Sequence, residues 1–174
     1  MNHSKSRPLV MIVDDERSMC ELIETDLRLR GIASKWYTSP AEAFEAIHSH
    51  DFDVILTDVR MPGTTGLQLC QQLSQSRPDI PVIVMTAFGT LETAVTAMRS
   101  GAYDFITKPI EMDLLSITLQ RAIDHRQLTE QVRLLESTRD DATAFGEIKG
   151  QSPVMRKLYD QLGQVAASNA AVLI

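Results

Sequence analysis

Five short apolar runs alternate with five stretches of helical periodicity in the first 126 residues of the chain. The apolar runs are rich in β-branched residues, which is typical of parallel strands that are covered on both faces. They occupy residues 9–13, 32–37, 52–57, 81–85 and 103–107. Strands that alternate with helices through short connections build a parallel sheet with helices packed on both sides. The alternation therefore predicts a three-layer, doubly wound α/β fold with five parallel strands.

Turn and capping residues divide the chain at the same places. Ser39 and Pro40 are typical of a helix N-cap and of the first helical position, while Gly31 and Gly101 suit the residue after a helix. For strands of this kind we expect the order 2-1-3-4-5, which is that of flavodoxin-like sheets. Ligands of such sheets bind at the carboxyl ends of the strands, where the order reverses between strands 1 and 3. We expect any functional site at that edge.

Acidic residues follow the first and the third apolar runs. Asp14 and Asp15 come directly after the first run, and Asp58 comes directly after the third. In the predicted sheet the three carboxylates meet at one rim, where they repel one another unless a cation lies among them. Oxygen ligands without a nearby histidine or cysteine favour Mg²⁺, or Mn²⁺, over zinc or copper. The pattern thus predicts a divalent metal site formed by Asp14, Asp15 and Asp58.

Two further strand ends carry groups that suit an anion. Thr86, after the fourth run, offers a hydroxyl, and Lys108, after the fifth, offers a compact positive charge. Each residue has an ordinary explanation by itself, since threonine is a good strand former and aspartate often closes a turn. Together they place a carboxylate nucleophile, Asp58, beside a metal, a hydroxyl and a lysine. That set suits phosphoryl transfer to the aspartate, because this chemistry depends on positioning and charge neutralisation.

The segments that carry these residues resemble the signature positions of response-regulator receiver domains. They read VDDE at 13–16, LTDVRMPG at 56–63, TAFG at 86–89 and DFITKP at 104–109. The resemblance spans roughly residues 8–126, so a receiver domain is expected over residues 1–126. It implies a CheY-like fold and a phosphoacceptor signalling domain of a two-component system, with no enzymatic activity beyond autodephosphorylation.

The resemblance also implies roles for individual residues. Asp58 is expected to accept the phosphoryl group from a sensor histidine kinase. Asp14 and Asp15 are expected to hold Mg²⁺, directly or through water, together with the backbone carbonyl of Arg60. Lys108 is expected to pair with the phosphoryl group.

Thr86 and Phe105 are expected, from the same resemblance, to form a coupled switch. The hydroxyl of Thr86 would move toward the phosphoryl group while the ring of Phe105 turns inward. Tyrosine is common at the latter position in the family, so this chain lacks one hydroxyl there. The switch would repack the face formed by helix 4, strand 5 and helix 5, through which we expect a homodimer.

The helical pattern that starts after Pro109 continues beyond the end of a receiver. We expect a linker helix over residues 127–145, in which Leu128, Val132 and Leu135 have the spacing of a short parallel coiled coil. A solvated single helix explains the same pattern, but an exposed apolar stripe favours a dimer. The polar residues 137–143 are expected to form a flexible junction.

Residues 146–174 resemble the start of the AAA+ ATPase domain of sigma-54-dependent activators, in segments 148–155, 165–168 and 171–174. The segments 87–95 and 98–105 are similar to receivers of the nitrogen-regulator class of these activators. No Gly-x-x-x-x-Gly-Lys-Ser/Thr motif occurs, so we interpret the chain as a truncated form that stops before the phosphate loop. The final strand would then lack its neighbours and be either disordered or paired with another molecule in a crystal contact. The full-length protein would act on RNA polymerase with sigma-54 and on DNA.

Composition restricts the partners of the chain itself. A formal net charge of -6 argues against nucleic-acid or anionic-membrane binding, since either partner requires a basic face. Cys20 and Cys70 have no second cysteine at metal-binding spacing and are expected to be buried free thiols. No apolar run approaches the ~18 residues of a membrane span, and residues 1–8 lack a signal-peptide core. We therefore expect a cytoplasmic protein.

Three alternatives share parts of this pattern. A flavodoxin has the same strand order, but Asp14, Asp15 and Glu16 would repel its flavin phosphate. A metal-dependent aspartyl-phosphate phosphatase uses an Asp-x-Asp pair after strand 1, where residue 16 here is glutamate. A pseudo-receiver, or a stand-alone interaction module, is disfavoured because none of the key groups is missing. The phosphoacceptor interpretation requires that Asp58 is accessible and faces Asp14, Asp15 and Lys108.

Overall fold

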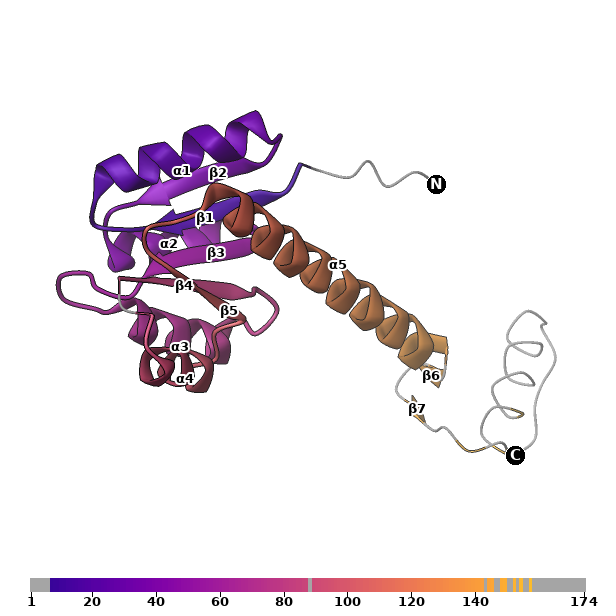
Figure 1. The fold of residues 1–174 in the computed structure, drawn as a ribbon. Coiled ribbons are helices and arrows are strands. Elements are labelled where there is room, and N and C mark those ends of the chain that lie inside the picture. The colour runs from indigo at the N-terminus through magenta and orange to yellow at the C-terminus, as the bar shows by residue number, and fades with distance from the viewer. Residues whose placement is uncertain are drawn as a thin grey trace. The chain divides into compact units, whose positions relative to one another are not determined.

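The computed structural model describes residues 7–87, 89–142, 144–145, 148–149, 152, 154 and 157. The chain forms two units, Met1–Leu128 and Thr129–Ile174. Five strands of the first unit form a parallel sheet in the order β2-β1-β3-β4-β5 (Figure 1). The strands are β1 Leu9–Val13, β2 Ala33–Tyr37, β3 Val54–Asp58, β4 Val82–Thr86 and β5 Asp104–Thr107.

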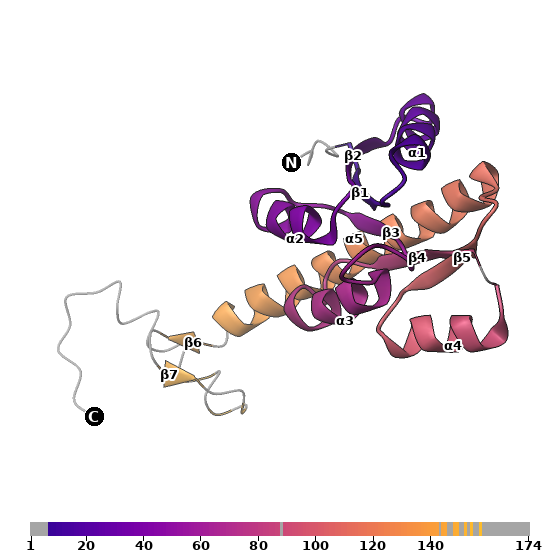
Figure 2. The same ribbon diagram turned by 90° about the vertical axis from the view of Figure 1, so that its left-hand side faces the viewer.

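Helices cover both faces of this sheet, and the three central strands β1, β3 and β4 are buried along nearly their whole length. The helices are α1 Arg17–Leu29, α2 Pro40–Ser49, α3 Gly66–Ser76, α4 Leu91–Arg99 and α5 Met112–Ala142. Ile12 of β1 belongs to a buried cluster with α1 and with Leu119 of α5. Met11, which points to the opposite face, belongs to a second cluster with α2 and with Leu69 of α3. Figure 2 shows α3 and α4 on the same side of the sheet.

The predicted fold class and strand order are confirmed. Four strands begin one or two residues later than expected, and two end one residue later, because Asp58 and Thr86 are the last residues of β3 and β4 and do not follow them. Both residues take part in the sheet register, Asp58 opposite Met85 and Thr86 opposite Thr107. The backbones of both residues are therefore fixed by the sheet.

The helix ends agree with the capping residues in all but one respect. Gly31 and Gly101 follow α1 and α4 with φ of 81° and 87°, the left-handed region in which glycine is favoured. Pro40 is the first residue of α2, as predicted. Ser39 is the N-cap of α2, as predicted, and has the extended backbone of that position, but its side chain makes no capping hydrogen bond. Proline at the first position still favours a helix start there, because its φ is already helical.

The C-terminal part of the chain differs from the sequence prediction. α5 continues to Ala142, so the junction expected at 137–143 is wrong for residues 137–142. The sequence of this stretch is polar but contains neither glycine nor proline, so its residue types are compatible with a helix. A short antiparallel pair, β6 Ala144–Phe145 and β7 Ile148–Lys149, follows. The segments 165–168 and 171–174 lie outside the described residues.

Other expectations of the sequence concern burial. Cys20 and Cys70 are free and buried, as predicted. Leu128, Val132 and Leu135 are each at least 46% exposed, so a dimer through them stays a prediction. Within the described part of the chain, no helix is both long and apolar enough to span a membrane.

Candidate functional site

Parallel pairing brings the ends of β1, β3, β4 and β5 to one edge of the sheet. Val13 at the end of β1 lies opposite Thr57, the residue before Asp58 in β3. The chain leaves β1 at Asp14 and β5 at Lys108, whose backbone N–H donates to the carbonyl of Thr86 at 2.7 Å. The predicted site residues Asp14, Asp58, Thr86 and Lys108 therefore lie at or directly after the ends of neighbouring strands. All four are at the same edge of the sheet, as predicted.

The ammonium of Lys108 lies between two carboxylates. Its Nζ is 2.8 Å from Oδ2 of Asp14 and 2.7 Å from Oδ1 of Asp58. Burial of Lys108 opposes its charged form, but the hydrogen bonds to the two aspartates outweigh this effect and raise the pKa of Lys108 above its ordinary value. Lys108 is thus a fixed positive charge at neutral pH, held where an added anion on Asp58 would meet it.

Asp58 is more enclosed than the sequence predicted. Only 8% of its side chain is exposed, whereas an accessible acceptor was expected. Its Oδ1 contacts Lys108, and its Oδ2 accepts a hydrogen bond from the backbone N–H of Arg60 at 2.6 Å. Both oxygens of the carboxylate are engaged by one partner each, so its orientation is fixed while each oxygen keeps a second lone pair.

The two acids after β1 have different surroundings. Asp14 is 1% exposed, and its Oδ1 accepts a hydrogen bond from the N–H of Glu16 at 2.9 Å. Asp15 is exposed. Among the described residues, no group of three or more carboxylate, histidine or cysteine side chains is close enough to hold a metal ion. The structure thus brings Asp14 and Asp58 together around Lys108 and leaves Asp15 at the surface.

The donor chemistry of this edge suits a hard divalent cation. The carboxylates of Asp14 and Asp58 and the backbone carbonyl of Arg60 are oxygen ligands, which Mg²⁺ prefers. Mg²⁺ also keeps several waters, through which an exposed carboxylate such as that of Asp15 can contribute. The residues present therefore fit the predicted ion by their chemistry.

The two predicted switch residues lie on neighbouring strands. Thr86 is 4% exposed at the end of β4. Phe105 is partly buried on β5, opposite Val84, and packs against the cluster that contains Leu69. Its position between the core and the surface is compatible with the predicted rotation of the ring.

Gly66 is a site residue that the sequence reasoning missed. A Cβ atom at this first residue of α3 would lie 1.9 Å from the backbone oxygen of Asp58 and 3.0 Å from Oγ1 of Thr57. The only signal in the sequence was a glycine directly after a possible N-cap, Thr65, which does not reveal what α3 approaches.

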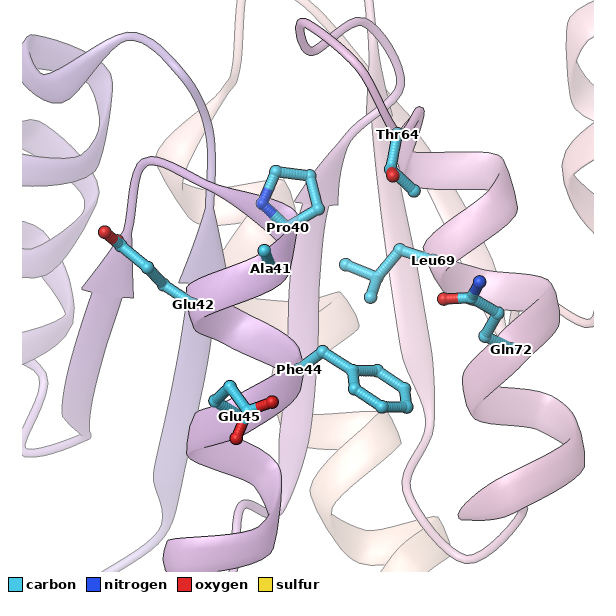
Figure 3. A pocket seen from close by; sticks show the side chains of 8 residues that line it. All are labelled: Pro40, Ala41, Glu42, Phe44, Glu45, Thr64, Leu69 and Gln72. Carbon is cyan, nitrogen blue, oxygen red and sulfur yellow. The ribbon is translucent and has the colours of Figure 1, made fainter.

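A groove between α2 and α3 is a separate feature of the surface. Figure 3 shows Phe44 and Leu69 facing each other across it, with Glu42 and Glu45 on the α2 side. Its lining is completed by small and uncharged residues: Pro40, Ala41, Thr64 and Gln72. Asp14, Asp58 and Lys108 do not line it, so this groove is not the acidic site.

Comparison with known families agrees with this geometry. Residues 10–120 match the model of the response regulator receiver domain, and this range contains every residue of the acidic edge described above. The chain belongs to the response-regulator receiver family. This receiver therefore has the phosphorelay signalling role of its family, at an edge where Asp14, Asp58 and Lys108 meet.

Similar proteins include three bacterial transcriptional regulators. The receiver chain is 36% identical to the regulatory protein ZraR of Klebsiella oxytoca over 95% of its length. It is 36% identical to the regulator NtrC of Escherichia coli K12 and to the response regulator PilR of Pseudomonas aeruginosa, over 97% in both cases. It spans only 35–36% of the length of these relatives. The predicted kinship with the nitrogen-regulator class is thereby confirmed.

Solved structures give the same result for the fold. The beryllofluoride-activated receiver domain dimer of NtrC4 has a TM-score of 0.64 and 32% identity, with 68% of this receiver and 98% of that chain covered. NtrX of Brucella abortus has a TM-score of 0.70 and 28% identity, with 95% of this receiver and 35% of that chain covered. Both resemblances agree with a sheet of order 2-1-3-4-5.

Proposed function

We propose that Asp58 accepts a phosphoryl group from a sensor histidine kinase. The observation that carries this proposal is the contact of one ammonium, that of Lys108, with the carboxylates of Asp14 and Asp58 at 2.8 and 2.7 Å. An oxygen of Asp58 forms a bond to phosphorus while the bond from phosphorus to the nitrogen of the donor histidine breaks. Transfer adds negative charge beside Lys108, which compensates for it, and positioning of this kind is the main requirement of phosphoryl transfer.

The two contacts of the Asp58 carboxylate determine how it is oriented for this step. Its Oδ1 is held by Lys108 and its Oδ2 by the N–H of Arg60. The attacking oxygen uses its second lone pair, while the contact of the other oxygen keeps the carboxylate oriented. We assign the retained contact to the N–H of Arg60, because Lys108 is a flexible side chain and can follow the new phosphoryl oxygens.

Mg²⁺ is proposed as the cofactor, with Mn²⁺ as a substitute. Asp14, Asp58 and the backbone carbonyl of Arg60 would hold it, and Asp15 would contribute through water. When bound, the ion neutralises charge on the transferred phosphoryl group. The net charge of -6 and the burial of Asp14 and Asp58 favour a cation at this edge.

The signal is proposed to pass through Thr86 and Phe105. A phosphoryl group has strong acceptor oxygens, which attract the hydroxyl of Thr86 and leave space for the ring of Phe105. This repacks the face of α4, β5 and α5, and shifts a population that already exists. Helices α4 and α5 expose several large apolar side chains: Leu91, Val95, Met98, Leu114 and Ile117. Such a surface suits a homodimer contact, which the linker helix over 127–145 would extend.

The remaining proposals concern the whole protein. Residues 146–174 are proposed to begin a sigma-54-interacting AAA+ domain, which the receiver at 1–126 would regulate. The support is the similarity to ZraR, NtrC and PilR across nearly the whole chain, although it spans about a third of their length. Through that domain the protein would act on sigma-54 RNA polymerase and on DNA.

Labelling with acetyl phosphate tests the acceptor directly. The wild-type chain is expected to incorporate phosphate in the presence of Mg²⁺, and Asp58→Ala to incorporate none. Asp124→Ala, which changes an exposed aspartate of α5, is the matched control and should label like the wild type. Label retained by Asp58→Ala would show that another residue is the acceptor.

Light scattering after size-exclusion chromatography tests the proposed dimer. With Mg²⁺ and beryllofluoride, which imitates the phosphoryl group on aspartate, the mass is expected to double from that of one 19.4 kDa chain. Asp58→Ala is expected to give the same mass with and without these additions. A wild-type mass that does not respond would contradict switching through dimerisation.

A further inference from the structure

Helix α3 begins in direct contact with the backbone of the proposed phosphoacceptor. A Cβ on Gly66 would lie 1.9 Å from the carbonyl oxygen of Asp58 and 2.8 Å from its carbonyl carbon. These atoms belong to β3, which is paired with strands on both sides. Unlike the end of a flexible side chain, this backbone cannot move aside. Only a residue without a side chain allows α3 to lie so close to Asp58.

Two backbone hydrogen bonds hold Val59, which lies in the loop between β3 and α3. The N–H of Gly66 donates to the carbonyl of Val59 at 3.1 Å, and the N–H of Val59 donates to Met85 of β4 at 2.8 Å. Between these points, the N–H of Arg60 donates to Oδ2 of Asp58 at 2.6 Å. Val59, the neighbour of Arg60, is thus bonded to both β4 and α3, so a displacement of α3 reaches Arg60 through Val59.

The start of α3 is itself tightly defined. Thr65 and Gln68 form a capping box, in which the N–H of Gln68 donates to Oγ1 of Thr65 and the N–H of Thr65 donates to Oε1 of Gln68. The first turn of α3 thus holds its shape against the loop. A displacement at Gly66 cannot be absorbed by unwinding this turn without loss of the box.

We propose that Gly66 is a positioning residue for phosphoryl transfer to Asp58. Its missing side chain lets α3 seat against the backbone of Asp58, and this seating holds the N–H of Arg60 on Oδ2. The inference rests on the proposed function, because it assumes that Asp58 is the acceptor. It adds that the reactivity of Asp58 depends on a residue eight positions later that offers no functional group.

The expected displacement follows from the distances. Real Cβ atoms essentially never lie closer than 3.0 Å to such neighbours, so Gly66→Ala must move α3 by about 1.1 Å from the present 1.9 Å. A movement of that size along the hydrogen bond of Arg60 lengthens it from 2.6 Å to about 3.7 Å, which no longer counts as a hydrogen bond. Misplacement by roughly 1 Å can slow a positioned reaction about 100-fold.

The test compares Gly66→Ala with Gly31→Ala. A Cβ on Gly31 meets nothing within 4 Å, but its φ of 81° makes alanine unfavourable, so this control carries backbone strain far from any predicted contact with Asp58. Gly66→Ala is expected to lower the rate of phosphorylation by acetyl phosphate on the order of 10- to 100-fold. Gly31→Ala should keep the wild-type rate.

A second measurement separates positioning from general loss of structure. The amide signal of Arg60 in a ¹H–¹⁵N spectrum reports its hydrogen bond to Asp58. In Gly66→Ala this signal is expected to shift upfield, while the signals of β1 and β4 stay in place. Should Gly66→Ala fail to fold, Gln68→Ala takes its place, because it loosens the capping box without a clash. It should slow labelling several-fold and shift the same amide.

The possible results distinguish a failure of the proposed function from a failure of the role proposed for Gly66. If the wild type takes up no phosphate, the proposed function has failed. If the wild type labels but both Gly66→Ala and Gln68→Ala label at its rate, or if the Arg60 amide does not respond, Gly66 has no positioning role. Slow labelling with a shifted Arg60 amide supports the proposal.

Discussion

Arg126 is predicted to be the side chain that fixes α5 to the amino-terminal edge of the sheet. Its guanidinium donates to the backbone carbonyl of Phe52 and contacts the carboxylate of Asp51. It also lies 3.5 Å from Asp53 and 3.7 Å from Asp79. Only 12% of the Arg126 side chain is exposed, so these contacts are largely shielded from water.

Replacing Arg126 by methionine keeps the apolar stem and removes the charge. The carbonyl of the buried Phe52 loses a donor, which costs about 1–3 kcal/mol. The contact with Asp51 adds only about 0–1 kcal/mol, because 79% of that side chain is exposed. The contacts with Asp53 and Asp79, whose side chains are each 25% exposed, together add a further contribution of about 0–1 kcal/mol. We expect a loss of about 1–5 kcal/mol, centred near 3 kcal/mol, in the free energy of unfolding.

Thermal and urea unfolding followed by circular dichroism measures this loss. For a domain of this size the loss corresponds to a melting temperature lower by roughly 10 °C. Arg121→Met is the matched control on the same helix, since Arg121 is 66% exposed and 4.0 Å from Asp104. Its effect should stay below about 0.5 kcal/mol. Equal stability of the two variants would refute the assigned role of Arg126.

Two further predictions concern charged groups. The hydrogen bond from Arg77 holds the pKa of Asp79 below its ordinary value, so its stabilising effect is present above about pH 4 and is lost as the pH falls through the lowered pKa. Asp79→Asn should therefore lower the melting temperature at pH 7 and lose less on acidification to pH 3 than the wild type; parallel curves would contradict this. Lys108→Met leaves Asp14 and Asp58 without their cation, so unfolding at pH 7 without metal should become easier by about 2–4 kcal/mol. Millimolar Mg²⁺ should restore part of the melting temperature, and no response to Mg²⁺ would contradict a metal site there.

The fold was predictable because its signals are local. The apolar runs at β1, β3 and β4 and the periodicity of α1 specify the layers without knowledge of any long-range contact. Boundaries were less predictable, as Asp58 and Thr86 show. Their polar side chains resemble loop residues, but their backbones pair with neighbouring strands, which only the assembled sheet provides.

The sequence predicted those residues of the site that lie at the ends of strands. Asp14, Asp58 and Lys108 lie directly after or at the end of apolar runs, and parallel strands bring such ends to one edge. The exposure of Asp15 and the enclosure of Asp58 did not follow, because they depend on the path of individual loops. The extent of α5 was also mispredicted, since polar residues without glycine or proline do not reveal a helix end.

The strand order 2-1-3-4-5 was expected only by analogy with flavodoxin-like sheets, and strand pairing sets it. The sequence by itself determined the alternation of strands and helices and the residues that carry charge at the strand ends. These features are encoded by periodicity and by position along the chain, which need no distant partner. Only the tertiary structure decided that Lys108 lies between two aspartates and that Gly66 must lack a side chain. The first joins residues 50 or more positions apart, and the second depends on how closely α3 packs against β3, so both distances are set only when the elements assemble. Such contacts leave no periodic pattern in the sequence, because each of them joins one particular pair of residues.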